Sequence, residues 1–302
     1  MHPAPSVIIF STLSGAGFGL LIFLGLGLPV VEGWIALVFY LIAFGLTVIG
    51  LLSSVFHLKN RKNAWRSYSQ WRSSWLSREA LAAVASLVLM GLYAAAQVFL
   101  ATTIAPLGWL GAALSLFTVY TTSMIYTQLR AVPRWNQWAT PVLFLTASLA
   151  GGALLSGNGT VAILLLALLG VVVLWHWWKG DRRFGEVGST LETATRLEGR
   201  VKLWEKPHTG ENYLTREMVY QIGRRHAVKL RVIAMGLMVV LPLLVLLLLG
   251  AHHVTGAVAV LSYLAGMAVQ RWLFFAEAEH VVGLYYGAHG NITANSSERT
   301  PA

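Results

Sequence analysis

The chain has 302 residues, of which 56% are hydrophobic and only 11% charged, and its mean hydropathy is +0.65. A soluble domain carries about a quarter of its residues as charged side chains, so this composition excludes an ordinary soluble enzyme. The formal net charge is +10, and the lack of cysteine excludes disulfides, thiolate-bound zinc and cysteine-held iron–sulfur clusters within this chain. We therefore expect an all-α integral membrane protein.

Eight apolar segments are long enough, or nearly so, to cross a bilayer core of about 30 Å as a helix of roughly 20 residues. In chain order they are residues 7–28, 34–56, 80–103, 108–128, 141–155, 161–178, 232–249 and 254–275. The fifth is the weakest, because Gly and Ser dilute its end. The first has no Lys or Arg before it and is expected to be a retained helix rather than a signal peptide. The runs are continuous, which argues against a membrane β-barrel.

The connections between these segments alternate between tight turns and polar loops. The polar loops cover about 59–77, 129–138 and 179–231. With eight crossings, these loops and both termini fall on one side, and all 22 Lys and Arg lie there or in the helix turns beside it. The positive-inside rule then predicts cytoplasmic termini in a bacterial inner membrane, with 179–231 as a polar cytoplasmic loop of a single membrane domain.

The first polar loop interleaves basic and aromatic residues. Its aromatic residues recur every three or four positions, so a helix would gather them on one face. Such a face suits membrane lipids at the interface or a partner protein, whereas nucleic acid is not expected beside two membrane spans. The basic face as a whole could also receive an acidic subunit. The candidate docking residues are Trp65, Arg66, Trp71, Arg72 and Trp75.

Ionisable residues stand where the second and third segments meet the polar face. His57 closes the second, and Glu79 opens the third with Arg78 beside it. A His and a carboxylate at one membrane face could exchange the two protons of quinone chemistry. The plainer alternative is an interfacial His and a Glu stabilised by its helix dipole. Tyr126, in the matching half of the fourth segment, could donate to a quinone carbonyl or simply hold helices together.

Haem binding and transport are the two alternatives to quinone chemistry. Haem b needs two His at matching depth on different helices, whereas the histidines here stand at helix ends, so no haem is expected. A multi-helix transporter is the alternative from a different class. Transporters commonly have inverted repeats and mid-membrane charges, but this chain shows no clear repeat and its charges follow one face.

Several stretches resemble the membrane-anchor subunits of the dimethyl sulfoxide reductase type, which belong to the complex iron–sulfur molybdoenzymes. They are residues 1–8, 64–79, 123–126, 207–217 and 271–280. The resemblance agrees with the eight helices expected from the apolar segments. It implies a molybdopterin catalytic subunit and an iron–sulfur subunit that dock on this anchor. It also implies electron exchange with the quinone pool (ubiquinone or menaquinone).

The same resemblance associates His57, and with it Glu79, with the quinone site. This chain departs from the family after His57, where it reads Leu-Lys-Asn-Arg instead of Leu-Gly-x-Pro. The stretches that end in Leu-Ser-Arg-Glu and Leu-Thr-Arg-Glu look most like anchors of cytoplasmic sulfite-oxidising enzymes, whereas a dimethyl sulfoxide reductase would run electrons in the opposite direction. The resulting expectation is a quinone-binding anchor subunit without a catalytic centre of its own.

Overall fold

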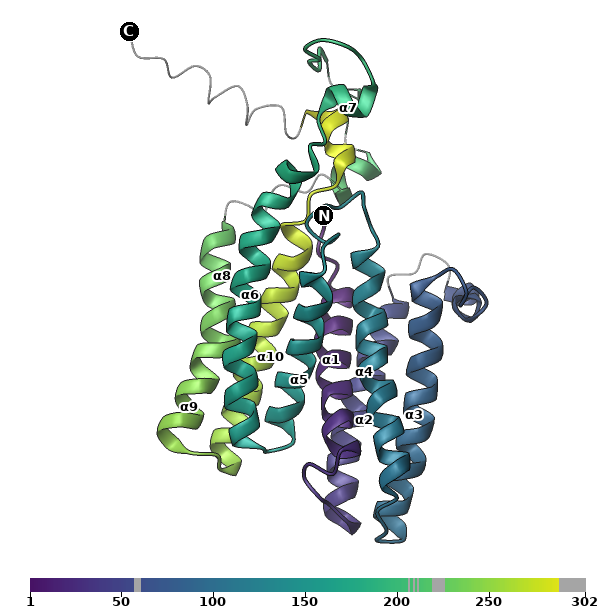
Figure 1. Ribbon diagram of the computed structural model, residues 1–302, viewed down its shortest axis with the longest axis vertical. Helices are drawn as coiled ribbons and strands as arrows, with labels where there is room; N and C mark the ends of the chain where they lie inside the picture. The colour runs from purple at the N-terminus through teal and green to yellow at the C-terminus, as the bar shows by residue number, and fades with distance from the viewer. Residues whose placement is uncertain (57–60, 206, 209, 211, 219–225, 288–302) are drawn as a thin grey trace.

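The computed structural model describes residues 1–56, 61–205, 207–208, 210, 212–218 and 226–287. Within these ranges the chain is all-helical and contains no strand. The long helices run side by side along the long axis of the molecule as one bundle (Figure 1). The protein is therefore an all-α membrane protein by composition and by structure.

Seven helical segments of the described residues are long and apolar enough to cross a membrane. One of the seven combines three consecutive elements, α8 (Ala227–Met235), the π-helical turn η4 (Gly236–Val240) and α9 (Leu241–Leu249). The other six are α1 (Pro5–Gly25), α2 (Gly33–Val55), α3 (Trp75–Phe99), α4 (Ala105–Thr127), α6 (Gly159–Val187) and α10 (His253–Ala276).

The remaining apolar helix is α5 (Ala139–Leu155), which has 17 residues. A helix of that length extends about 26 Å, which is near the lower limit for a bilayer core. It packs against α1, α4, α6 and α10, inside the bundle. Eight membrane crossings require that α5 also spans the membrane, so the predicted number of crossings stays a prediction.

The structure moves several boundaries away from their predicted positions, and two of these shifts have a clear local description. α3 begins at Trp75 instead of residue 80, because the chain is extended at Ser74 and turns helical directly after it. α6 continues through the charged residues 179–187 and ends where Gly188 takes a left-handed conformation with φ +65°. The 179–231 segment thus contains the end of one helix and the start of another, with α7 (Leu191–Thr195) and η2 (Leu214–Met218) between them.

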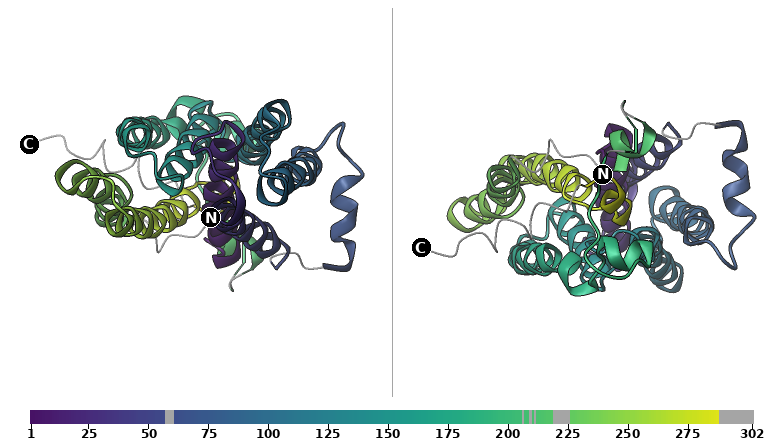
Figure 2. Two further views of the ribbon diagram at one scale, coloured as in Figure 1. Left: turned by 90° about the horizontal axis from the view of Figure 1, so that it is seen from below. Right: turned by 90° about the horizontal axis from the view of Figure 1, so that it is seen from above.

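α1 lies in the middle of the bundle, in contact with α2, α4, α5 and α10 (Figures 1 and 2). Small residues permit this close packing, as is common between membrane helices. A Cβ atom at Gly19 would overlap the carbonyl oxygen of Ser148 in α5, and a Cβ at Gly25 would come within 2.5 Å of the carbonyl oxygen of Gly108 in α4. The central position of α1 therefore requires glycine at its contacts.

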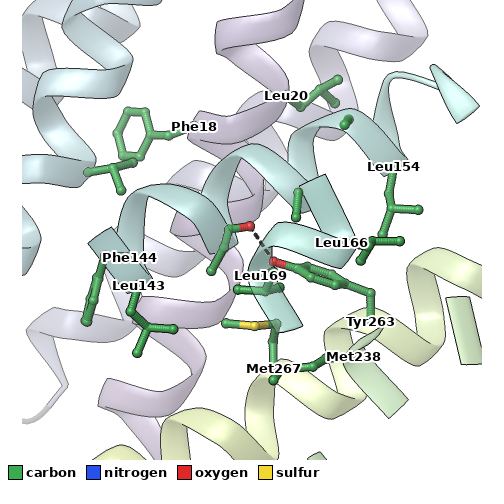
Figure 3. Packing of buried hydrophobic residues seen from close by; sticks show 14 of the residues in the cluster. Phe18, Leu20, Leu143, Phe144, Leu154, Leu166, Leu169, Met238, Tyr263 and Met267 are labelled. Carbon is green, nitrogen blue, oxygen red and sulfur yellow. Dashed lines mark hydrogen bonds between the residues drawn. The ribbon is translucent and has the colours of Figure 1, made fainter. Parts of the chain in front are cut away.

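Figure 3 shows the apolar core where α5, α6 and α10 meet. Leu143, Leu166 and Leu169 are fully buried there. The hydroxyl group of Tyr263 in α10 donates to the carbonyl oxygen of Ala147 in α5 at 2.5 Å. The core thus combines apolar packing with a hydrogen bond that satisfies the buried hydroxyl group.

The π-helical turn η4 is explained by Pro242, which follows it. Pro242 has no N–H group, so it cannot donate to the preceding turn, and its ring crowds an α-helical carbonyl. The chain widens at this point, and the N–H of Leu241 donates to Gly236, five residues earlier. The carbonyl oxygen of Leu237 accepts a hydrogen bond from Ser262 Oγ of α10 at 2.6 Å. A neighbouring helix thus supplies the donor that proline lacks.

Segments far apart in the sequence meet at one end of the bundle, which we call the polar end. The amino group of Met1 donates to the carbonyl oxygen of Ala278 at 2.7 Å, and the N–H of His2 donates to Glu217 at 2.7 Å. Val281 opens η5 (Val281–Tyr286), and its N–H donates to Ala131 in the loop between α4 and α5. These bonds place the start of α1 and the end of α10 together.

Candidate functional site

Glu79 is a buried carboxylate near the start of α3. The helix turns it inward because Ala82, Ala83 and Ser86 follow on the same face at helical spacing, and all three are buried. One carboxylate oxygen accepts a hydrogen bond from Thr122 Oγ1 of α4 at 2.5 Å. α3 and α4 therefore share a polar contact close to the polar end.

Tyr126 follows Thr122 by one turn on the same face of α4. Its buried ring packs against Trp135 at 5.3 Å between centroids and against Phe274 of α10 at 5.4 Å. It also interacts electrostatically with Glu79 and with Arg271 of α10. The structure thus brings together Glu79 and Tyr126, two of the residues that the sequence predicted for the quinone site.

Arg78 points away from Glu79. Its Nε donates to the carbonyl oxygen of Trp71 at 2.9 Å and its Nη2 to that of Arg72 at 2.8 Å. The guanidinium group lies 4.3 Å from the ring centroid of Trp75. Arg78 therefore holds the preceding loop against the start of α3. The fourth predicted residue, His57, lies outside the described residues.

The basic and aromatic loop lies at the margin of the bundle. Its helical part, η1 (Arg61–Tyr68), contacts α3 and stands beside the bundle rather than within it (Figure 2). Trp65 and Trp71 are 65% and 51% exposed. The guanidinium groups of Arg66 and Arg72 lie 5.7 Å and 5.2 Å from the rings of these tryptophans. Four of the five predicted docking residues are thus presented as two cation–π pairs.

The fifth predicted docking residue has a different environment. Trp75 is half-buried and packs edge-on against Tyr120 of α4 at 6.0 Å. It also carries Arg78 on its ring, as described above. Trp75 therefore joins the loop to the bundle, whereas the other four residues are presented outward.

Two buried polar residues are absent from the predicted site. Arg271 of α10 is 2% exposed, and its guanidinium group lies 3.7 Å from the ring centroid of Phe144. His176 of α6 is 1% exposed, and its ring stacks on Phe274 at 5.9 Å. In the sequence both residues stand near the polar ends of apolar segments, where ionisable side chains are common, so their burial becomes evident only in the structure.

A network of four charged residues lies at the polar end. Arg134 pairs with Glu277 at 2.6 Å and with Asp181 at 2.8 Å. Arg231 pairs with the same two acids, at 2.7 Å and 2.6 Å. The network joins the loop before α5 to α6, α8 and the end of α10, and it lines a pocket of about 200 Å³. In the ranges covered by the structure, no group of three or more His, Asp or Glu is arranged to hold a metal ion.

Comparisons with known proteins agree with this architecture. The family model for the DMSO reductase anchor subunit (DmsC) matches residues 1–287. A sulfite dehydrogenase subunit from Allochromatium vinosum is 33% identical to this chain over 328 aligned residues, which cover 95% of this chain and 99% of the relative. No solved structure matches. These matches favour an anchor subunit over the transporter alternative. The chain therefore belongs to the DMSO reductase anchor subunit family, the membrane anchors of molybdoenzyme complexes.

Proposed function

We propose that this chain passes electrons between an iron–sulfur subunit and the quinone pool, in a complex with a molybdopterin-containing catalytic subunit. The observation that carries the proposal is the buried Glu79, hydrogen-bonded to Thr122 and in electrostatic contact with Tyr126 near the polar end. Reduction of a quinone consumes two protons with two electrons, so a buried carboxyl group beside the headgroup supplies what the reaction needs.

Each predicted residue has a separate role in this proposal. Glu79 and His57 exchange protons with the headgroup, and the hydroxyl group of Tyr126 orients it by a hydrogen bond. Arg78 shapes the border of the site through the loop that it holds. The quinone lies at the polar end because the basic loops that would receive the iron–sulfur subunit belong to that end, which keeps the path of the electrons short.

We further propose that the complex oxidises sulfite. The support is the 33% identity to a sulfite dehydrogenase subunit over 95% of this chain. The family name supports the alternative, a DMSO reductase that runs electrons from quinol to the catalytic subunit. The purified complex distinguishes them: sulfite-dependent reduction of a quinone supports the first, and quinol-dependent reduction of dimethyl sulfoxide supports the second.

The orientation in the membrane is part of the proposal. In the sequence, all 22 Lys and Arg fall in the polar loops, the tail or the helix turns beside them, and the positive-inside rule assigns that side to the cytoplasm of a bacterial inner membrane. The iron–sulfur subunit would then dock from the cytoplasm. A reporter that is active only in the periplasm, fused after Ala302, should stay inactive; activity there would reverse the orientation.

Variants at the site test the quinone role. Glu79→Gln keeps the hydrogen-bond acceptor for Thr122 but removes the exchangeable carboxyl proton, and His57→Ala removes the second group. Each should lower quinone-coupled turnover by at least about 100-fold, the usual contribution of general acid–base catalysis. Transfer of electrons to an artificial dye and assembly of the complex should stay within about twofold of wild type, because neither depends on proton exchange at the quinone.

The matched control is Glu186→Gln, which removes an exposed carboxylate from the same end of the bundle. This variant should keep normal quinone turnover. If Glu79→Gln also turns over quinone at the wild-type rate, Glu79 is a structural partner of Thr122 and the site assignment is wrong.

A further inference from the structure

Buried polar groups continue from Glu79 through the bundle to the polar-end network. Glu79 and Tyr126 interact electrostatically, and the ring of Tyr126 lies 5.4 Å from that of Phe274. The ring of His176 and the guanidinium group of Arg271 lie 5.9 Å and 6.0 Å from the same Phe274 ring. His176 also interacts electrostatically with Asp181 and Arg134 of the network. These residues belong to α3, α4, α10 and α6, so the row crosses the bundle between helices instead of following one of them.

Several atoms of this row lack hydrogen bonds to the protein. Both ring nitrogens of His176, and Nε and Nη1 of Arg271, have no partner among the residues that the structure describes. The same holds for both polar atoms of the Gln270 side chain, on the same turn of α10. All three side chains are almost completely buried. A buried donor or acceptor without a partner costs about 1–3 kcal/mol, so a cluster of them indicates a missing partner.

Internal water is the partner that fits these atoms. Buried waters typically make about three hydrogen bonds to otherwise unsatisfied polar groups. An imidazole ring, an amide and a guanidinium group together offer donors and acceptors on several sides. Apolar ligands are excluded because they would leave these atoms unsatisfied, and none of the salt bridges found in the described part of the chain involves Arg271.

The row ends at an opening. Asp181 and Arg134 line the pocket of about 200 Å³ at the polar end, together with Arg231, Glu277 and Glu279. Asp181 is half-exposed to solvent. Protons can therefore reach the outer end of the row from water, whereas its inner end lies at the buried carboxylate of Glu79.

We propose that His176, with Arg271 and Gln270, orders a chain of internal waters that carries protons between the polar-end pocket and Glu79. The inference rests on the proposed function, because it supplies the two protons that each quinone takes up with its two electrons. His176 is the relay: an imidazole ring can accept a proton at one nitrogen and release one from the other. Arg271 and Gln270 are positioning residues that hold the waters.

The test compares variants of His176 in the purified complex. His176→Leu keeps a similar volume but cannot bind water. It should lower quinone-coupled turnover at least about tenfold and raise the solvent deuterium isotope effect, because proton delivery becomes limiting. His176→Gln can still hydrogen-bond water and should recover part of the rate. Reduction of an artificial dye should be unchanged in both variants.

The control is Trp177→Phe, the next residue of α6, which is also buried but packs under Arg231. It should leave the rate and isotope effect as in wild type. If His176→Leu does not assemble, the comparison of His176→Gln with wild type decides, and a normal rate with a normal isotope effect refutes the relay.

The same preparations separate this inference from the quinone proposal. If Glu79→Gln abolishes quinone turnover while His176→Leu keeps the wild-type rate and isotope effect, the relay is refuted and the quinone site stands. If Glu79→Gln is fully active, the proposed quinone site is refuted. The proposed proton relay to that site is then refuted as well.

Discussion

At the residue scale, the salt bridges of the polar end differ in how much water reaches them. The side chains of Arg134 and Glu277 are 10% and 5% exposed, whereas those of Arg183 and Glu186 are 30% and 45% exposed. In a buried salt bridge both charged groups have been removed from water, so the loss of one partner leaves the other charge buried without compensation. An exposed pair is screened, and its loss is nearly neutral.

We therefore expect Glu277→Gln to destabilise the protein by about 3 kcal/mol, at the lower end for a buried pair because Arg134 keeps Asp181. Glu186→Gln, the control, should change the free energy of unfolding by about 0–1 kcal/mol. Thermal unfolding of both variants in detergent measures the difference. Equal unfolding midpoints would show that Glu277 contributes no more than a surface charge.

His280 predicts a pH dependence just after α10. Burial lowers the pKa of its ring below the usual value near 6.5, and the charged amino terminus lowers it further. Its Nδ1 accepts a hydrogen bond from the N–H of Val282 at 3.0 Å, which requires the neutral ring. Because the folded-state pKa is depressed, the stabilisation is complete above about pH 6.5 and is lost as the pH falls through the folded-state value.

Hydrogen exchange of the Val282 amide measures this effect. Exchange protection, corrected for intrinsic rates, should fall between about pH 7 and about pH 5 in the wild-type chain. In His280→Asn, which keeps an acceptor but does not titrate, protection should be independent of pH in that range. Protection that is constant in the wild type would show that the ring stays neutral or that the bond does not matter.

At the scale of helices, the contact between α1 and α5 depends on a lack of side chains. A Cβ atom at Gly152 would overlap the backbone of Gly19, and backbone cannot give way as a flexible side chain can. Gly152→Ala should therefore separate the helices and destabilise the bundle by about 1–3 kcal/mol. Gly91→Ala is the control, because nothing lies within 4 Å of its Cβ position.

Thermal unfolding of the two glycine variants gives the measurement. Gly91→Ala should unfold at the wild-type temperature or slightly above it, since Ala favours the helix over Gly. A Gly152→Ala protein as stable as Gly91→Ala would mean that α5 shifts at no cost.

The elements themselves were largely predictable from hydropathy. Runs of apolar residues placed every long helix, because a bilayer accepts few other structures. The end of α6 was not predictable, because it depends on the left-handed Gly188 and on Asp181 meeting Arg231 from another helix. The π-helical turn depends on a contact with α10, which no local pattern reveals.

The candidate site was predictable only in part. Glu79 stands out in the sequence because ionisable residues are rare in membrane-spanning segments, and Tyr126 is a candidate because it lies in the matching half of the fourth segment. The sequence placed Arg78 beside Glu79, but adjacent residues on a helix point to different sides, and the structure shows Arg78 bonded to the loop before α3. Arg271 and His176 are also ionisable residues of apolar helices. Their proximity to the Glu79 site depends on the packing of four helices, which the sequence does not reveal.

At the scale of the whole molecule, the charged and aromatic loop is the surface through which we expect a partner to dock. Charge steers association, and exposed Trp supplies contact area that is buried in the complex. Neutralising Arg66 and Arg72 together should lower the amount of iron–sulfur subunit that purifies with the anchor, at least about fivefold at physiological salt. Arg299→Gln, in the tail, should leave that amount unchanged.

The competing occupant of this loop is anionic lipid, because the loop stands beside the bundle (Figure 2) and toward one end of the helices (Figure 1). The lipid alternative predicts normal assembly of the double variant and less anionic lipid in the purified protein. Mass spectrometry of bound lipid, together with the stoichiometry of the subunits, separates the two. Normal assembly would remove Arg66 and Arg72 from the docking surface.

The π-helical turn before Pro242 also determines how the membrane segment Ala227–Leu249 is phased. Ala234, Met238 and Leu246 are buried although they are four and eight residues apart, a spacing that drifts about 40° around a regular helix with each step of four. The wider turn absorbs that drift, so α8 and α9 both face the bundle. A deletion of one residue within α9, beyond this turn, would rotate the residues that follow it by about 100° relative to Arg231. In the regular part of such a segment, an insertion or deletion rotates everything beyond it, so the length of the chain is constrained as tightly as its composition.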